Sequence, residues 1–371
     1  MRVLVTGGAG FIGSHLVDAL VARGHAVRVL DSLEPQVHGA QGRAPEYANP
    51  AAELRVGDVR DRTALRAALA GVDAVFHQAA AVGVAQSMYE IERYVSANAL
   101  GAAVLLEELV ERRAQLRRVV VASSMSLYGE GAYRDADGAV AYPRLRPTAQ
   151  LEARRWELED ARGRALSPLP TPESKPLAPT SIYAITKRDH EEMFLAVGDA
   201  YGIPTVALRY FNVYGTRQAL SNPYTGVLAI FSARLLNGRA PLIFEDGGQS
   251  RDFVHVSDVV AANLLALERD AAVGRVFNVG TGRATTVLAV AEALARELRG
   301  GCPPEVSGRF RAGDVRHCVA DVTAITRELG FEPRTRFEQG LRELLGWLRT
   351  QSPVDRVDQA RRELESRGLA R

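Results

Sequence analysis

Apolar strand-like segments alternate with helical segments along the first 125 residues, and this alternation constrains the fold more than any other feature. The pattern predicts strands at 2–7, 26–31, 53–58, 74–79 and 118–124, and helices at 11–23, 61–70 and 89–112. Strands that alternate with helices form a parallel sheet with right-handed crossovers. Because these strands are rich in valine and apolar almost throughout, we expect helices on both faces of the sheet.

The remainder of the chain first breaks this alternation and then resumes it. Residues 130–180 hold seven of the 17 prolines, so a long surface insertion is expected there, helical in part at 150–161. After it, strands are expected at 204–212, 242–245, 253–255 and 275–280, and helices at 181–201, 227–236, 257–268, 287–298, 323–329 and 337–348. The charged segment 354–369 carries Val357, Ala360 and Leu364 at helical spacing.

Composition excludes several classes of protein. Hydrophobic residues make up 47% of the 371 residues and charged residues 24%, an ordinary globular balance, and no apolar run reaches the ~20 residues of a membrane span. The net charge of +2 gives no field that would recruit nucleic acid. Two cysteines form neither a disulfide framework nor a metal cluster, so no metal is expected. With no signal peptide ahead of the first strand, we expect a reducing cytoplasm.

A glycine-rich turn joins the first predicted strand to the first helix. In the segment 6–13 the glycines Gly7, Gly10 and Gly13 surround Phe11 and Ile12. Glycines allow the tight turn and the close approach of a pyrophosphate to the backbone, and the amides at the helix N-terminus face that charge. The segment therefore predicts a dinucleotide site, and the alternative is a purely structural turn.

Acidic residues at the ends of the next strands refine this prediction. Asp31 follows Gly13 by 18 residues, the position at which a carboxylate binds the adenosine ribose hydroxyls. A carboxylate there repels a 2′-phosphate, so the cofactor expected is NAD and not NADP. Asp58 and Val59 end the third strand and either border the adenine or form a plain loop.

A tyrosine and a lysine four residues apart open the helix at 181–201. This spacing places Tyr183 and Lys187 on one helical face. A nearby cation lowers the pKa of a phenol, so Tyr183 is the candidate base for a sugar hydroxyl. Of the 46 basic residues only Lys175 and Lys187 are lysines, and arginine would not hold the same geometry here. Ser124 ends the fifth strand, where its hydroxyl can share the proton of the reacting oxygen, or cap a loop.

Taken together with further motifs, these residues carry a resemblance that covers roughly residues 1–350. The further motifs are His77-Gln78-Ala79-Ala80, Asn98, and the segments 209–215 and 251–258. The chain resembles the extended short-chain dehydrogenase/reductases of the NAD-dependent sugar-nucleotide epimerase/dehydratase family. The resemblance implies a Rossmann-like doubly wound sheet, a smaller α/β C-terminal domain that binds a nucleoside-diphosphate sugar, and a homodimer.

The resemblance also implies domain bounds and further site residues. The NAD-binding domain is expected over 1–215, with the insertion at 130–180. Part of 250–275 is expected to belong to this domain as well. The substrate domain and a helical tail are expected over 216–371. Ala79, Ala80 and Asn98 are implied at the cofactor. Residues implied at the nucleotide sugar are Ser124, Ser126, Asn212, Asn222, Arg251 and Arg311, with Arg316 as a further phosphate candidate.

The residues after Ser124 discriminate between members of the family. Dehydratases carry an Asp-Glu pair there, and decarboxylases of UDP-glucuronate place a glutamate at the position of Ser126. Met125 and Ser126 cannot act as acid or base, so the minimal set Ser124, Tyr183 and Lys187 favours 4-epimerisation through a 4-keto sugar.

Two segments, 36–39 and 218–226, and the insertion at the mouth of the site are most similar to the branch that acts on dTDP-L-rhamnose and forms dTDP-6-deoxy-L-talose. Three other functions stay open. They are UDP-hexose 4-epimerisation, a net 4-ketosugar reduction, and a non-catalytic NAD sensor. A reductase often prefers NADP, which Asp31 disfavours, and a sensor usually lacks the tyrosine or the lysine.

Overall fold

The computed structural model describes residues 1–39, 41–298, 302–311 and 313–369. Residues 370–371, the end of the expected C-terminal tail, lie outside this part of the chain. A seven-stranded parallel sheet forms the larger half, in the order β3-β2-β1-β4-β5-β9-β14. Its strands are β1 (Arg2–Thr6), β2 (Ala26–Asp31), β3 (Glu53–Val56), β4 (Ala74–His77), β5 (Arg118–Ser124), β9 (Thr205–Tyr210) and β14 (Val276–Val279).

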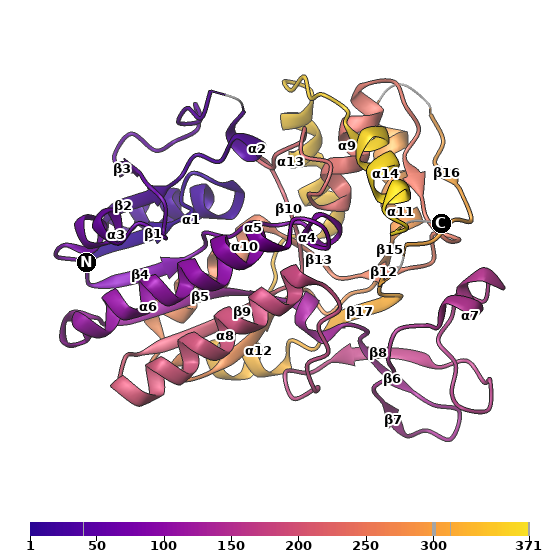
Figure 1. Ribbon diagram of the computed structural model, residues 1–371, viewed down its shortest axis with the longest axis horizontal. Helices are drawn as coiled ribbons and strands as arrows, with labels where there is room; N and C mark the ends of the chain where they lie inside the picture. The colour runs from indigo at the N-terminus through magenta and orange to yellow at the C-terminus, as the bar shows by residue number, and fades with distance from the viewer. Residues whose placement is uncertain (40, 299–301, 312, 370–371) are drawn as a thin grey trace.

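Helices cover both faces of this sheet, as the apolar strands predict (Figure 1). One face packs on α1 (Phe11–Ala22), α10 (Val256–Glu268) and α12 (Thr323–Leu329). The other face packs on α3 (Arg62–Leu69), α6 (Gly101–Glu111) and α8 (Ile182–Tyr201). Successive strand residues point to opposite faces, so Val3 and Val5 join the first core while Leu4 joins the second. The α/β, Rossmann-like doubly wound fold is confirmed.

The helix predicted at 89–112 is divided in three. It consists of α5 (Ile91–Tyr94), a π-helical turn η1 (Val95–Leu100) and α6, after the short α4 (Val84–Ser87). Single π-helical turns are rare and often lie at functional sites. Short helices also occur at α2 (Pro35–His38), η2 (Arg113–Gln115), η3 (Met125–Tyr128) and η4 (Asp270–Ala272).

The insertion forms a second sheet, which the prediction of a surface excursion missed. Its strands β6 (Ala132–Arg134), β7 (Val140–Ala141) and β8 (Ser167–Thr171) join β17 (His317–Ala320), β12 (Ser250–Arg251) and β15 (Thr285–Thr286). The helix predicted at 150–161 is wrong, because α7 covers only Thr148–Glu152. The Gln150 side chain donates to the carbonyls of Arg155 and Glu157, and this folds the chain back after α7.

A third group of helices forms the C-terminal half. They are α9 (Val227–Leu236), α11 (Val287–Glu297), α13 (Phe337–Leu348) and α14 (Val357–Ser366). The first three share one apolar core, and α14 lies beside α9, to which the Arg234–Asp358 ion pair joins it (Figure 1). Two parallel pairs complete the fold: β10 (Asn212–Tyr214) with β13 (Phe253–His255), and β11 (Leu242–Ile243) with β16 (Glu305–Val306). No helix in the described residues has both the length and the apolar character needed to cross a membrane.

Candidate active site

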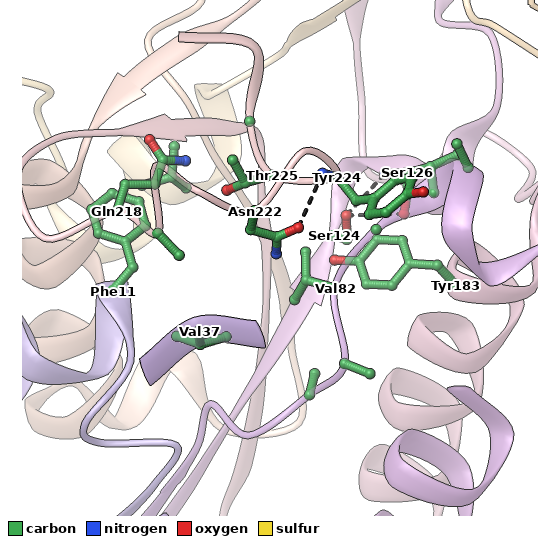
Figure 2. Close-up of a pocket in the computed structure, with 18 of the residues that line it drawn as sticks. Phe11, Val37, Val82, Ser124, Ser126, Tyr183, Gln218, Asn222, Tyr224 and Thr225 are labelled. Atoms are coloured by element: carbon green, nitrogen blue, oxygen red, sulfur yellow. Dashed lines mark hydrogen bonds between the residues drawn. The ribbon is translucent and has the colours of Figure 1, made fainter. Parts of the chain in front are cut away.

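A cavity of about 890 Å³ runs from the glycine-rich turn to α14. It lies at the carboxyl ends of the parallel strands, where open α/β sheets bind their ligands. Figure 2 shows Phe11 and Val37 at one end of the view, with Ser124, Ser126 and Tyr224 gathered beside Tyr183 at the other. All of the predicted site residues except Asn98 and Arg316 line this cavity: Gly7, Gly10, Phe11, Ile12, Gly13, Asp31, Asp58, Val59, Ala79, Ala80, Ser124, Ser126, Tyr183, Lys187, Asn212, Asn222, Arg251 and Arg311.

The turn at the start of α1 has the geometry of a pyrophosphate cradle. Gly7 has a φ of +70°, and a Cβ there would lie 2.7 Å from the Ala79 nitrogen. A Cβ on Gly13 would lie 2.2 Å from the Gly7 oxygen. Among the described residues no side chain caps α1, and its first turn carries no acidic residue, so its backbone amides can face an anion. These residues fit a dinucleotide.

Asp31 lies at the end of β2 beside this turn. Its buried carboxylate accepts hydrogen bonds from the backbone nitrogens of Ala9 and Leu33, at 3.0 and 2.9 Å. These bonds hold the carboxylate at the cavity wall, and its remaining lone pairs can accept from ribose hydroxyls. Asp58 is held differently, because Arg60 binds both of its oxygens and lowers the pKa of its carboxyl group.

Replacing Asp31 with alanine is expected to shift cofactor preference from NAD towards NADP. The dissociation constant for NADP divided by that for NAD should fall by about tenfold or more, because NAD loses its hydrogen bonds to a charged group. Fluorescence titration with both cofactors measures this ratio. Asp58→Ala is the control and should weaken both cofactors equally. An unchanged ratio in Asp31→Ala would show that another residue selects the cofactor.

Ser124, Tyr183 and Lys187 all line the cavity. Ser124 ends β5, and its Oγ accepts a hydrogen bond of 2.9 Å from the Ser126 hydroxyl. Tyr183 and Lys187 stand in the first turns of α8, which Ser181 caps through the Ala184 nitrogen. The end of β5 therefore positions Ser124, and the start of α8 positions Tyr183 and Lys187.

Burial changes the pKa values of both ionisable groups. It lowers the pKa of the Lys187 ammonium to about 7, and this ammonium donates a 2.8 Å hydrogen bond to the Ala122 carbonyl. Burial raises the pKa of the Tyr183 phenol, while a hydrogen bond with Ser124 acts in the opposite direction. The predicted lowering of the phenol pKa by Lys187 is therefore wrong for this arrangement, because desolvation dominates.

Asn98 is the predicted cofactor residue that does not reach the cavity. It is fully buried in η1, and its side chain bonds the backbone nitrogen and oxygen of Ala81 and the Thr186 hydroxyl. Its own carbonyl pairs with His190. Asn98 therefore braces the backbone of Ala81, which lines the cavity, against α8.

The C-terminal side of the cavity is rich in arginine. The Arg251 guanidinium donates to the carbonyls of Ser250, Val315 and Arg316, which fix its position. Arg311 pairs with Asp314 and lies 4.7 Å from the centre of the Phe244 ring. The phosphate candidate Arg316 is wrong, because its guanidinium is buried among carboxylates and does not line the cavity.

Gln36 and Tyr224 line the cavity although neither was predicted individually as a site residue. They fall in the segments 36–39 and 218–226, whose pattern the sequence already marked. Gln36 bonds both Gln86 and Asn222, and the Tyr224 hydroxyl lies 2.6 Å from that of Tyr89, which is outside the cavity lining. Three buried oxygens at the cavity have no hydrogen-bond partner in the part of the chain that the structure describes, and a ligand can satisfy them. They are Asn212 Oδ1, Gln218 Oε1 and Gln249 Oε1.

The insertion was expected at the mouth of the site, and this is wrong for the described residues. Of residues 130–180, only Thr180 lines the cavity. In Figure 1, β6, β7 and α7 point away from α14 and the helices beside it. The insertion is instead held by its own sheet, by the buried Arg146–Glu245 ion pair and by an ion pair between Glu157 and Arg316. The groups of three or more metal-binding side chains that a metal site requires are absent from the described residues.

Together, the doubly wound fold, the glycine cradle and the serine, tyrosine and lysine define a dinucleotide-dependent enzyme of the short-chain dehydrogenase/reductase type. A profile of the NAD dependent epimerase/dehydratase family matches residues 3–150 and 164–280. The chain belongs to this family, and its cofactor is NAD. The cofactor and family predictions are thus confirmed.

Individual relatives are similar over nearly the whole chain. The dTDP-L-rhamnose 4-epimerase of Burkholderia thailandensis is 38% identical over 94% of this chain and 94% of its own length. The crystal structure of UDP-glucose 4-epimerase from Thermotoga maritima with UDP-glucose has a TM-score of 0.77 and 34% identity, covering 94% of this chain and 99% of the other. UDP-glucose 4-epimerase from Thermus thermophilus in complex with NAD has a TM-score of 0.73 and 32% identity, covering 95% and 100%.

Proposed function

We propose that this enzyme epimerises a nucleoside-diphosphate sugar at carbon 4. The observation that carries the proposal is the composition of the site around Tyr183. Ser124, Tyr183 and Lys187 meet there, while Met125 and Ser126 take the places where dehydration would need an acid and a base. A site with one proton-transfer group and a tightly held dinucleotide suits oxidation and reduction at a single carbon.

Ser124, Tyr183 and Lys187 each have a separate role in the proposed reaction. Tyr183 takes the proton of the 4-hydroxyl, and the Ser124 hydroxyl holds that oxygen in place. Lys187, on the same face of α8, would hold the ribose of the cofactor. When bound, NAD supplies the acceptor for a hydride from carbon 4. The 4-keto sugar turns over within the cavity, so that the hydride returns to the opposite face of carbon 4 while Tyr183 returns its proton to the 4-oxygen.

The proposed substrate is dTDP-L-rhamnose, and the product dTDP-6-deoxy-L-talose. The support is the Burkholderia relative, together with segments 36–39 and 218–226. These two segments meet in the fold, because Gln36 Nε2 donates to Asn222 Oδ1 at 2.9 Å. UDP-hexose is the second candidate, and the Thermotoga and Thermus structures support it.

A proton NMR time course tests this function. The purified protein, without added cofactor, is incubated separately with dTDP-L-rhamnose and with UDP-glucose. We expect a new anomeric signal from dTDP-L-rhamnose at constant mass and without free NADH. Turnover of UDP-glucose alone would retain the mechanism and exclude the proposed substrate. No turnover of either substrate would contradict both candidates.

We also propose the wider setting of the enzyme. The NAD half comprises residues 1–215 with the returning α10 and β14, and the substrate half comprises most of 216–371. The family resemblance supports a homodimer. The two cysteines are free thiols, which is consistent with a cytoplasmic protein.

A further inference from the structure

The C-terminal helix α14 forms part of the cavity wall. Val357, Ala360, Arg361 and Leu364 line the cavity at spacings of three and four residues, so one face of α14 is directed into it. The family profile ends at residue 280, well before this helix. The part of the cavity wall that α14 forms therefore lies outside the residues that the family profile matches.

Contacts along its length hold α14 in this place. At its start, Asp358 pairs with Arg234 and Arg239 at 3.1 and 3.0 Å. Further along, Glu365 pairs with Arg309 at 2.8 Å. Beyond its end, the Arg367 guanidinium lies 4.3 Å from the centre of the Tyr89 ring. The helix thus spans from the C-terminal helices to the NAD half, across the cavity.

Arg361 differs from the other arginines on the C-terminal side of the cavity. Arg251 donates to three backbone carbonyls, Arg311 to Asp314, and Arg234 to Ala240 and Asp358. The closest carboxylate oxygens to Arg361 belong to Asp358 and Glu365, at 3.8 and 3.9 Å, beyond hydrogen-bond distance. Its Nε is buried and has no hydrogen-bond partner among the described residues.

This arrangement resembles a binding group without its ligand. The Arg361 Nε is buried without an acceptor although 34% of the side chain is exposed, and a phosphate oxygen is a strong acceptor for a guanidinium. We propose that Arg361, carried by α14, binds the diphosphate of the nucleotide sugar. The inference rests on the proposed function, because it assumes that this side of the cavity holds a nucleoside diphosphate. Arg361 would then be a substrate-binding residue that acts beside Arg251 and Arg311.

Arg361→Gln tests the proposal, with Arg362→Gln as the matched control. Arg362 is the next residue of α14, and it is exposed and outside the cavity lining, so both variants remove one positive charge from one helix. Calorimetric titration of the NAD-bound protein with dTDP and with thymidine measures binding. Arg361→Gln should weaken dTDP at least about tenfold, or about 1.4 kcal/mol, and leave thymidine unchanged. Arg362→Gln should match the wild type, and Arg361→Lys should recover part of the loss.

Steady-state kinetics with the substrate gives a second readout. A residue that only binds the diphosphate raises KM in Arg361→Gln and leaves kcat within about twofold. Equal dTDP affinity in Arg361→Gln and the wild type would overturn the inference, as would an equal loss for thymidine. If the wild-type protein binds neither dTDP nor UDP, the proposed function itself fails. The two failures are therefore distinguishable.

Discussion

Replacing Tyr183 with phenylalanine is expected to lower kcat by about 10²–10⁴, while the protein keeps its NAD. The change removes only the hydroxyl that exchanges a proton with the 4-hydroxyl of the sugar. The ring can stay in place, because the Ser87 hydroxyl holds the Tyr183 backbone nitrogen and the Tyr94 ring packs edge-on against the phenol ring. NMR turnover and the NAD content of the purified variant are the two measurements.

Tyr201→Phe provides the matched control for this experiment. Tyr201 ends the same helix, is half exposed and lies outside the cavity lining, so loss of its hydroxyl should leave both measurements unchanged. Undiminished turnover in Tyr183→Phe would exclude this tyrosine as the base. A variant that lost NAD as well as turnover would show that Tyr183 holds the cofactor rather than moving a proton.

Replacing Glu245 with alanine is expected to lower the free energy of unfolding by about 3–5 kcal/mol. Glu245 is fully buried, and its two oxygens accept hydrogen bonds from both arms of the Arg146 guanidinium, at 2.7 and 2.9 Å. Arg316 adds a third bond at 3.1 Å. Without the carboxylate, the buried Arg146 loses its charged partner. Urea unfolding of the variant and the wild type, both holding NAD, measures the loss.

The neighbouring Asp246 supplies the control for this stability experiment. It pairs with the same Arg316, yet nearly half of its side chain is exposed, so Asp246→Ala should cost at most about 1 kcal/mol. Equal losses in the two variants would contradict the distinction between buried and exposed partners. The Arg316 carbonyl also accepts a bond from Arg251, so Glu245→Ala should raise KM for the nucleotide sugar as well.

The same ion pairs explain what the insertion does in this fold. Arg146 and Glu157 belong to the insertion, whereas Glu245, Asp246 and Arg316 belong to the C-terminal half. The insertion therefore stabilises the sheet that carries Arg251, and so supports the substrate side of the cavity. It does so without lining the cavity, apart from Thr180.

Local sequence patterns determined the sheet and most of the site. Valine-rich strands and the helices between them specify a parallel sheet, and the edge of that sheet is where Gly7, Asp31 and Ser124 meet. Each of these residues stands at the end of a strand, and Tyr183 and Lys187 stand at the start of a helix. Such ends are local features, so their neighbours in the chain are enough to place them.

The tertiary structure alone decided the roles of residues whose partners are distant in the chain. Arg316 had the pattern of a phosphate ligand, yet Glu157, 159 residues earlier, draws it into a buried ion network. Asn98 points to the backbone of Ala81 because η1 turns it inward. Arg361 reaches the cavity because salt bridges from Asp358 and Glu365 hold α14 there. Periodicity describes which face of a helix is apolar, but long-range packing determines what that face contacts, and no local pattern contains that information.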